Sequence, residues 1–358
     1  MENSLAEFYR GKSVLVTGHT GFKGGWLTAW LRILGARVIG FSLPPETRPN
    51  LFEAARIGQD VVSILGDIRE LAPLSAVCSE HAPEIVFHNA AQPLVRRSYR
   101  EPVETYATNV MGTVHVLEAA RKSPSARAIV IVTSDKCYEN REWVWGYREG
   151  EAMGGRDPYS SSKGCAELVA AAYRHSFFSK DSQTAVASAR AGNVIGGGDW
   201  AEDRLVPDIV RGISSGKPIV LRRPGAIRPW QHVLEPLRGY LMLGQLLWNA
   251  GQPYAQAWNF GPRDEDAISV AQLAERMVSF WGAGQLTFQQ NPEEPHEAHY
   301  LKLDCSKARA RLGWGPLLGV DEAVQWSVEW YRAYLEDPES ARPITTSQIQ
   351  SYMGKASA

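Results

Sequence analysis

The chain has 358 residues, enough at roughly 150 residues per domain for two domains or one large one. Its composition, 44% apolar and 22% charged, is close to the globular average and excludes a disordered or collagen-like chain. The formal net charge of −1 provides no overall attraction for nucleic acid or anionic membranes, and no apolar stretch reaches the roughly 20 residues of a membrane helix. We therefore expect small-molecule partners or further copies of the chain, with no nucleic acid and no membrane.

Apolar, β-branched runs alternate with helical patterns along the first 190 residues. The predicted strands are residues 13–16, 37–41, 61–65, 85–88, 128–133 and 184–189. The predicted helices between them are residues 26–34, 103–122 and 159–175. Strands separated by helices predict an α/β fold of the Rossmann type, with a doubly wound parallel sheet.

The pattern loosens after residue 190. A glycine-rich loop at 192–198, a short strand at 219–222 and a loop at 226–232 precede three predicted helices, at 233–248, 270–281 and 321–334. We predict a Rossmann domain over residues 1–190, a smaller α+β substrate-binding cap over 191–342, and a mobile tail over 343–358.

The cysteines and the N-terminus indicate the compartment. Cys78, Cys137, Cys165 and Cys305 form no CxxC pair and have no histidine at zinc spacing. The first ten residues contain no apolar core of an export signal. We expect reduced thiols, no metal site and a cytoplasmic protein.

A glycine-rich turn joins the first predicted strand to its helix, with glycines at positions 18, 21 and 24. Without side chains there, the backbone can approach a pyrophosphate at the positive helix N-terminus. The motif predicts a dinucleotide cofactor, and an ordinary strand-to-helix turn is the alternative. The predicted cofactor-binding residues of this turn are Gly18, His19, Gly21, Phe22, Lys23 and Gly24.

The end of the second strand lacks the acidic residue that would bind the ribose of NAD. Ser42 stands in that stretch, and Arg48 is placed to meet a 2′-phosphate, so the residues themselves leave NAD and NADP open. Asp67, after the third strand, is a candidate partner for the adenine amine. A solvated turn aspartate is the alternative.

A redox pair is predicted on the helix at 159–175. Tyr159 and Lys163 are four residues apart and so share a helix face, where a neighbouring ammonium lowers the pKa of a phenol. Ser134, at the end of the fifth strand, can hydrogen-bond the same substrate hydroxyl. A solvated helix pair is the alternative for Tyr159 and Lys163.

Together these residues resemble the short-chain dehydrogenase/reductase superfamily, in its extended form that acts on nucleotide sugars. The resemblance is carried by residues 17–24, Asn89-Ala90-Ala91, Asn109, Ser134, Tyr159 and Lys163, which have the order and approximate spacing of the superfamily. The stretches 18–27, 133–138 and 228–233 are similar to those of its 4,6-dehydratases, within the branch that acts on CDP-glucose. The resemblance implies NAD as the cofactor, with Ile68, Ala90 and Ala91 in its site.

Asp135 and Lys136 distinguish elimination from epimerisation, because epimerases of the superfamily lack this acid/base pair. The chemistry implied is oxidation at C4 by Tyr159, proton removal at C5, loss of the C6 hydroxyl, and return of the hydride to C6. Asp135 is the expected acid and Lys136 the candidate base. The alternative is that Lys136 only pairs with Asp135.

Arginines of the cap suit a sugar diphosphate. The predicted substrate-binding residues are Gln92, Asn193, Arg204, Arg222, Arg228 and Tyr300; a solvated or core-edge position is the alternative for Tyr300. The helices at 103–122 and 159–175 are equivalent to those that form a dimer seam in the resembled superfamily, which implies a homodimer or homotetramer. Other nucleotide-sugar dehydratases, an epimerase, and a non-catalytic NAD-binding sensor or scaffold are the alternative functions.

Overall fold

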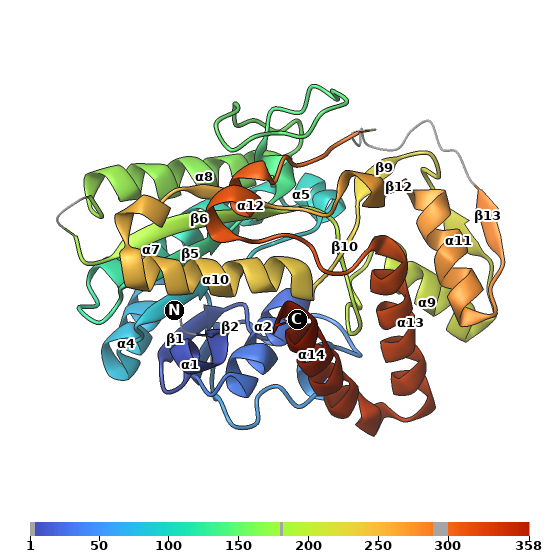
Figure 1. The fold of residues 1–358 in the computed structure, drawn as a ribbon, viewed down its shortest axis with the longest axis horizontal. Coiled ribbons are helices and arrows are strands. Elements are labelled where there is room, and N and C mark those ends of the chain that lie inside the picture. The colour runs from blue at the N-terminus through green and yellow to red at the C-terminus, as the bar shows by residue number, and fades with distance from the viewer. Residues whose placement is uncertain (1–3, 180–181, 289–299, 358) are drawn as a thin grey trace.

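The fold is built on a seven-stranded parallel sheet (Figure 1). The structure is a computed structural model that describes residues 4–179, 182–288 and 300–357. The strands of the sheet are β1 (Ser13–Thr17), β2 (Arg37–Ser42), β3 (Val62–Leu65), β4 (Ile85–His88), β5 (Ala128–Val132), β6 (Ala185–Ala191) and β11 (Ala257–Phe260). Their order is β11-β6-β5-β4-β1-β2-β3, so the winding direction reverses between β1 and β4. The predicted doubly wound fold is confirmed, and its ligand crevice lies at this reversal.

Helices cover both faces of the sheet, which explains why every residue of β1, β4, β5 and β6 is buried. Helices α2 (Phe22–Ile33) and α10 (Leu234–Ala250) contribute to the core on one face. Helices α4 (Leu71–His81), α7 (Gly112–Arg121) and α8 (Pro158–Ser176) contribute to the core on the other. The two cores take alternate residues of each strand, as a pleated sheet requires.

The helical run predicted over residues 103–122 contains an irregular turn. Helix α6 (Pro102–Tyr106) continues through a π-helical turn (Ala107–Met111) into α7. Such turns are frequent at functional sites. Here the turn carries Asn109, whose amide side chain bonds both backbone groups of Gln92 and donates to Ser162 Oγ at 2.8 Å.

The cap combines helices with three two-stranded sheets. The loop predicted at 226–232 is wrong, because those residues form β9 (Ile227–Pro229) and β10 (Gln231–His232). Their partners are β12 (Ala267–Ser269) and β7 (Val194–Ile195), and β8 (Ile219–Leu221) pairs with β13 (Leu286–Phe288). The cap helices are α9 (Leu205–Ser215), α11 (Val270–Trp281), α12 (Ser306–Leu312) and α13 (Val320–Glu336).

The segment for which the sequence predicts a mobile tail is helical in the structure. Helix α14 (Ala341–Ser357) lies beside α2 and α13 (Figure 1). Ile349 and Tyr352 are fully buried, and the Tyr352 hydroxyl donates to Glu235 Oε2 at 2.7 Å. Burial of these side chains holds the helix in place, and we correct the predicted mobility on this ground.

Two further features of residues 4–179, 182–288 and 300–357, which the structure describes, concern membrane-spanning helices and metal-binding clusters. Within them, no helix is both long and apolar enough to cross a membrane, and no three His, Cys, Asp or Glu side chains are grouped to hold a metal ion. The four cysteines are free thiols.

Candidate active site

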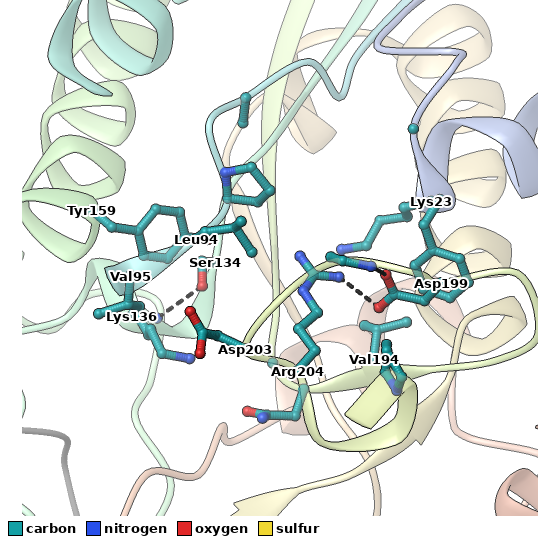
Figure 2. A pocket seen from close by; sticks show the side chains of 18 of the residues that line it. Lys23, Leu94, Val95, Ser134, Lys136, Tyr159, Val194, Asp199, Asp203 and Arg204 are labelled. Atoms are coloured by element: carbon teal, nitrogen blue, oxygen red, sulfur yellow. Dashed lines mark hydrogen bonds and ion pairs between the residues drawn. The ribbon is translucent and has the colours of Figure 1, made fainter. Parts of the chain in front are cut away.

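A cavity of about 590 Å³ lies at the carboxyl ends of the central strands, closed on its other side by the cap. Most of the residues predicted for the site line it: Gly18, Gly21, Phe22, Lys23, Ser42, Asp67, Ile68, Ala90, Ala91, Ser134, Asp135, Lys136, Tyr159, Lys163, Asn193, Arg204, Arg222 and Arg228. Figure 2 shows Ser134, Lys136 and Tyr159 gathered on one side, with Lys23 and Arg204 on the other. The topology therefore brings together residues from both predicted domains.

The glycine-rich turn has the geometry of a diphosphate site. Gly18 has φ +75°, and a Cβ on it would lie 2.7 Å from the backbone of Ala90. A Cβ on Gly24 would lie 2.0 Å from the carbonyl oxygen of Gly18. Only glycine fits this turn, and α2 begins at Phe22 in the cavity wall, so its N-terminal amides are available to an anion.

The part of the cavity predicted to hold the adenosine of the cofactor differs from the sequence prediction at Arg48 and Glu46. Ser42 is buried and its hydroxyl hydrogen-bonds Thr20 Oγ1 at 2.7 Å. Arg48 is exposed and does not line the cavity, whereas Glu46 does. Glu46 accepts from Arg97 Nη1 at 3.1 Å. The sequence reasoning missed Glu46 because it follows two prolines beyond the strand, past the position where such a carboxylate ordinarily stands.

Asp67 lines the cavity with its carboxylate held by Arg69. The Arg69 backbone amide donates to one carboxylate oxygen at 2.8 Å, and Nε donates to the other at 2.8 Å. These bonds keep the pKa of Asp67 below its ordinary value. The carboxylate is thus ionised and oriented, as a partner for an amino group must be.

Four of the predicted residues do not line the cavity. His19 lies beneath the turn with Nε2 2.8 Å from Ser63 Oγ, and burial lowers its pKa to about 4, so its ring is neutral. Gln92 donates to Thr105 Oγ1 at 2.9 Å, and this hydrogen bond stabilises the conformation of its loop. The Tyr300 hydroxyl donates to the carbonyl of Val144 at 3.3 Å, and Gly24 packs under Gly18 as described above. The side chains of His19, Gln92 and Tyr300 make structural contacts that the sequence pattern could not show.

Tyr159 and Lys163, the predicted redox pair, lie in the first two turns of α8. The Asp157 side chain caps the helix by accepting from the Ser160 amide at 2.9 Å, which places Tyr159 and Lys163 on one buried face. Lys163 Nζ donates to the carbonyl of Val132 at 3.3 Å, and burial lowers its pKa to about 8.

The phenol of Tyr159 behaves differently from the sequence prediction. Burial raises the pKa of Tyr159 to about 12, although a hydrogen bond with Ser134 and the charge of Arg204 lower it. In the protein alone, loss of solvent around the phenolate therefore outweighs the contacts that lower the pKa of Tyr159.

Asp135 and Lys136 follow directly, in a single 3₁₀ turn (Asp135–Cys137). Asp135 is 1% exposed, and its Oδ1 accepts from Ser134 Oγ at 3.0 Å. Its Oδ2 is buried without a hydrogen-bond partner among the described residues. Lys136 Nζ lies 4.0 Å from Asp135 Oδ1, with its side chain 32% exposed. The pair can therefore exchange protons with a ligand in the cavity.

Arginines of the cap and Lys23 of α2 line the cavity, and two of the arginines are paired with aspartates. Arg204 Nη1 donates to Asp199 Oδ2 at 2.8 Å (Figure 2), and Arg222 Nη1 donates to Asp203 Oδ1 at 2.7 Å. Burial lowers the pKa of Lys23 to about 7, and the charges of Lys163 and Arg204 act in the same direction. A diphosphate entering this space would relieve the repulsion among these cations.

The comparisons with known proteins agree with this geometry. The sequence matches the GDP-mannose 4,6 dehydratase family over residues 15–326. It is 53% identical to a CDP-glucose 4,6-dehydratase of Salmonella typhimurium, over 97% of each chain. It is 25% identical to a dTDP-glucose 4,6-dehydratase of Xanthomonas campestris, over 88% of this chain and 92% of the relative.

Solved structures share the fold. A dTDP-glucose 4,6-dehydratase of Bacillus anthracis in complex with NAD superimposes with a TM-score of 0.76 at 22% identity, covering 93% of this chain and all of that one. A UDP-glucose 4-epimerase of Stenotrophomonas maltophila gives 0.79 at 21% identity, covering 91% of this chain and 99% of that one. The sequence match extends across most of both predicted domains, and the chain belongs to the GDP-mannose 4,6 dehydratase family.

Proposed function

We propose that this protein is an NAD-dependent CDP-glucose 4,6-dehydratase, a hydro-lyase that forms CDP-4-keto-6-deoxyglucose and water. The 53% identity to such an enzyme over nearly the whole chain supports the substrate. The observation that carries the reaction is that Ser134, Asp135, Lys136, Tyr159 and Lys163 line one cavity. Redox residues alone would suit an epimerase, and the adjoining acid/base pair is what elimination requires. The product class suits the synthesis of deoxysugars of the O-antigen type.

The glycine-rich turn before α2 has the space that the diphosphate of NAD requires. The diphosphate would lie on the amides of the glycine-rich turn, where Gly18 and Gly24 leave no space for side chains. Asp67 would meet the adenine amine, and Tyr159 with Lys163 would hold the nicotinamide ribose. NAD bound there would supply the acceptor for the hydride from C4 of the sugar and the donor of that hydride to C6.

The protein's own groups move the protons of the first stage. Tyr159, as phenolate, removes the C4 hydroxyl proton, while Ser134 orients that hydroxyl. Because burial holds the pKa of Tyr159 at about 12 in the protein alone, the deprotonated form depends on neighbouring cations. Arg204 is one cation whose charge lowers the Tyr159 pKa, and we assign to Lys163, on the same helix face, a second positive charge in the proposed reaction. Each pKa unit corresponds to about 1.36 kcal/mol.

Asp135 and Lys136 perform the second stage. The ketone at C4 acidifies the C5 proton, which Lys136 removes and then returns to C5 when the hydride adds at C6. Asp135, which lines the cavity, protonates the departing C6 hydroxyl. Its Oδ2 is the carboxylate oxygen that has no hydrogen-bond partner among the described residues. Asn193, Arg204, Arg222 and Arg228 bind the nucleotide diphosphate so that C4 faces Tyr159 and C6 faces Asp135.

The test is incubation of the purified protein and NAD with CDP-, dTDP-, GDP- and UDP-glucose, followed by mass spectrometry. Water loss from CDP-glucose in preference to the others is the expected result. CDP-glucose deuterated at C4 should yield product deuterated at C6. Label retained at C4, washed out to solvent, or an epimer that keeps its C6 hydroxyl would contradict the proposal.

We further propose a cytoplasmic homodimer, or a homotetramer that contains it. Val103, Met111 and Leu168 expose large apolar side chains on α6, the π-helical turn and α8. Such a face would gain stability from a second copy. Ala166 and Ala170 of α8 are buried within their own chain. Sedimentation of Leu168→Glu against the unmodified protein tests the seam, with loss of the dimer expected.

A further inference from the structure

A buried ion pair lies directly behind the redox residues. Glu167 follows Lys163 by four residues in α8 and so occupies the same face, one turn on. Its carboxylate Oε2 lies 2.8 Å from Arg190 Nη2, and both side chains are 4% exposed. Neither residue lines the cavity. Any effect of Glu167 on the reaction is therefore exerted through other residues.

The Glu167 carboxylate is completely hydrogen-bonded. Oε1 accepts from Thr133 Oγ1 at 2.5 Å, and Oε2 accepts from Ser188 Oγ at 2.7 Å as well as from Arg190. Arg190 and these donors hold the pKa of Glu167 below its ordinary value despite its burial. An ionised carboxylate, paired with Arg190, is thus fixed between α8 and strands β5 and β6.

Lys163 and Glu167 form hydrogen bonds with two adjacent residues of the chain. Lys163 Nζ donates to the carbonyl of Val132, and the next residue, Thr133, donates its hydroxyl to Glu167. Ser134 comes immediately after. The position of the catalytic serine relative to Tyr159 and Lys163 therefore depends on a link that Glu167 completes.

Charge provides a second link between the same groups. Lys163 is buried, which disfavours its ammonium form and lowers its pKa to about 8, and the nearby carboxylate of Glu167 opposes this effect. At this value a modest further decrease would leave the amine largely neutral at physiological pH. A neutral Lys163 would no longer stabilise the phenolate of Tyr159.

We propose that Glu167 is a positioning residue of the redox site: its carboxylate acts on Lys163 from one helical turn away, and its hydrogen bond with Thr133 holds the end of β5 that precedes Ser134. The inference rests on the proposed function for the part that Lys163 plays in oxidation. The effect of Glu167 on the charge of Lys163 does not depend on which substrate the protein uses.

The test compares Glu167→Gln with the unmodified protein by two readouts. The first is the pH profile of kcat for water loss from CDP-glucose, whose alkaline limb should move to lower pH by about one unit or more, as expected when a nearby opposite charge is removed. The second is direct NMR titration of lysines carrying ¹³C at Cε, with the Lys163 signal assigned by Lys163→Met. The Lys163 titration should shift in the same direction.

Ser188→Ala is the matched control, because it removes one hydrogen bond to Glu167 but keeps the charge. It should leave the Lys163 titration within a few tenths of a unit. If Glu167→Gln leaves Arg190 unpaired and fails to fold, the double variant Glu167→Gln/Arg190→Met removes both charges, which buried pairs tolerate better. In the double variant the Lys163 titration should shift in the same direction but by a smaller amount, because removal of the Arg190 charge favours the ammonium form of Lys163.

The outcomes separate this inference from the proposed function. Absence of water loss in the unmodified protein would contradict the function, and the NMR titration would still decide the role of Glu167. An unchanged Lys163 titration in the folded single or double variant would overturn the inference. An equal shift in Ser188→Ala would also overturn it, because hydrogen bonding rather than charge would then be responsible.

Discussion

Gly192, directly after β6, leaves the space that Asp135 occupies. A Cβ at this position would lie 2.8 Å from Asp135 Oδ2 and 3.0 Å from Pro229 Cγ. Restoring a contact of roughly 3.5 Å requires a movement of roughly half an ångström or more. Asp135 is 1% exposed and bonded to Ser134, so its carboxylate has little freedom to move without losing its orientation.

Gly192→Ala should therefore slow water loss by about ten- to a hundredfold, because misplacement of a catalytic group by 1 Å can cost about a hundredfold. Cofactor reduction, which depends on Tyr159 on another element, should change by only a fewfold. Gly192 has no left-handed φ, so alanine adds no backbone strain that would confuse the result.

The assay is a single turnover of CDP-glucose, in which absorbance of the reduced nicotinamide and mass spectrometry of the sugar are followed together. The variant should accumulate reduced cofactor and the 4-keto sugar that retains its C6 hydroxyl. Gly225→Ala is the control, since a Cβ there meets no atom within 4 Å. Unchanged water loss in Gly192→Ala, or loss of cofactor reduction to the same extent, would refute the reasoning.

Two further predictions concern the catalytic pairs and the cofactor. Tyr159→Phe should abolish both cofactor reduction and water loss in the single-turnover assay, whereas Asp135→Asn should slow mainly water loss; equal loss of both steps in Asp135→Asn would show that Asp135 is not the elimination acid. Ser42→Asp should tighten NAD binding about tenfold in calorimetric titrations of stripped protein, because a hydrogen bond to a charged group contributes roughly 1.5 to 3 kcal/mol. Unchanged affinity would indicate that another group, such as Glu46, already supplies this contact.

Local pattern was sufficient to predict the Rossmann core. The strands of residues 13–16 and 85–88 and the helix of residues 159–175 lie within a residue or so of β1, β4 and α8. Their periodicity reflects contacts that each segment makes along its whole length with one or both faces buried. The positions of Tyr159 and Lys163 on one face follow from helix geometry alone.

The cap and the C-terminus were predicted less well, because their structure depends on distant partners. Strand β9 forms only by pairing with β12, and β10 only with β7. The last helix contains polar residues throughout, and its placement depends on the contacts of Ile349 and Tyr352 with segments far earlier in the chain. No signal within these segments indicates such partners.

For the active site, the sequence by itself predicted a set of residues that line one cavity in the structure: the glycine-rich turn at Gly18 and Gly21, Ser134 with Asp135 and Lys136, and Tyr159 with Lys163. Only the tertiary structure decided their environment. It showed that His19 and Gln92 serve the fold, that Gly192 leaves space for Asp135, and that Glu167 stands behind Lys163. The physical reason is that residue type and helical spacing are local, whereas burial, charge and van der Waals contact depend on neighbours that the fold brings from other parts of the chain.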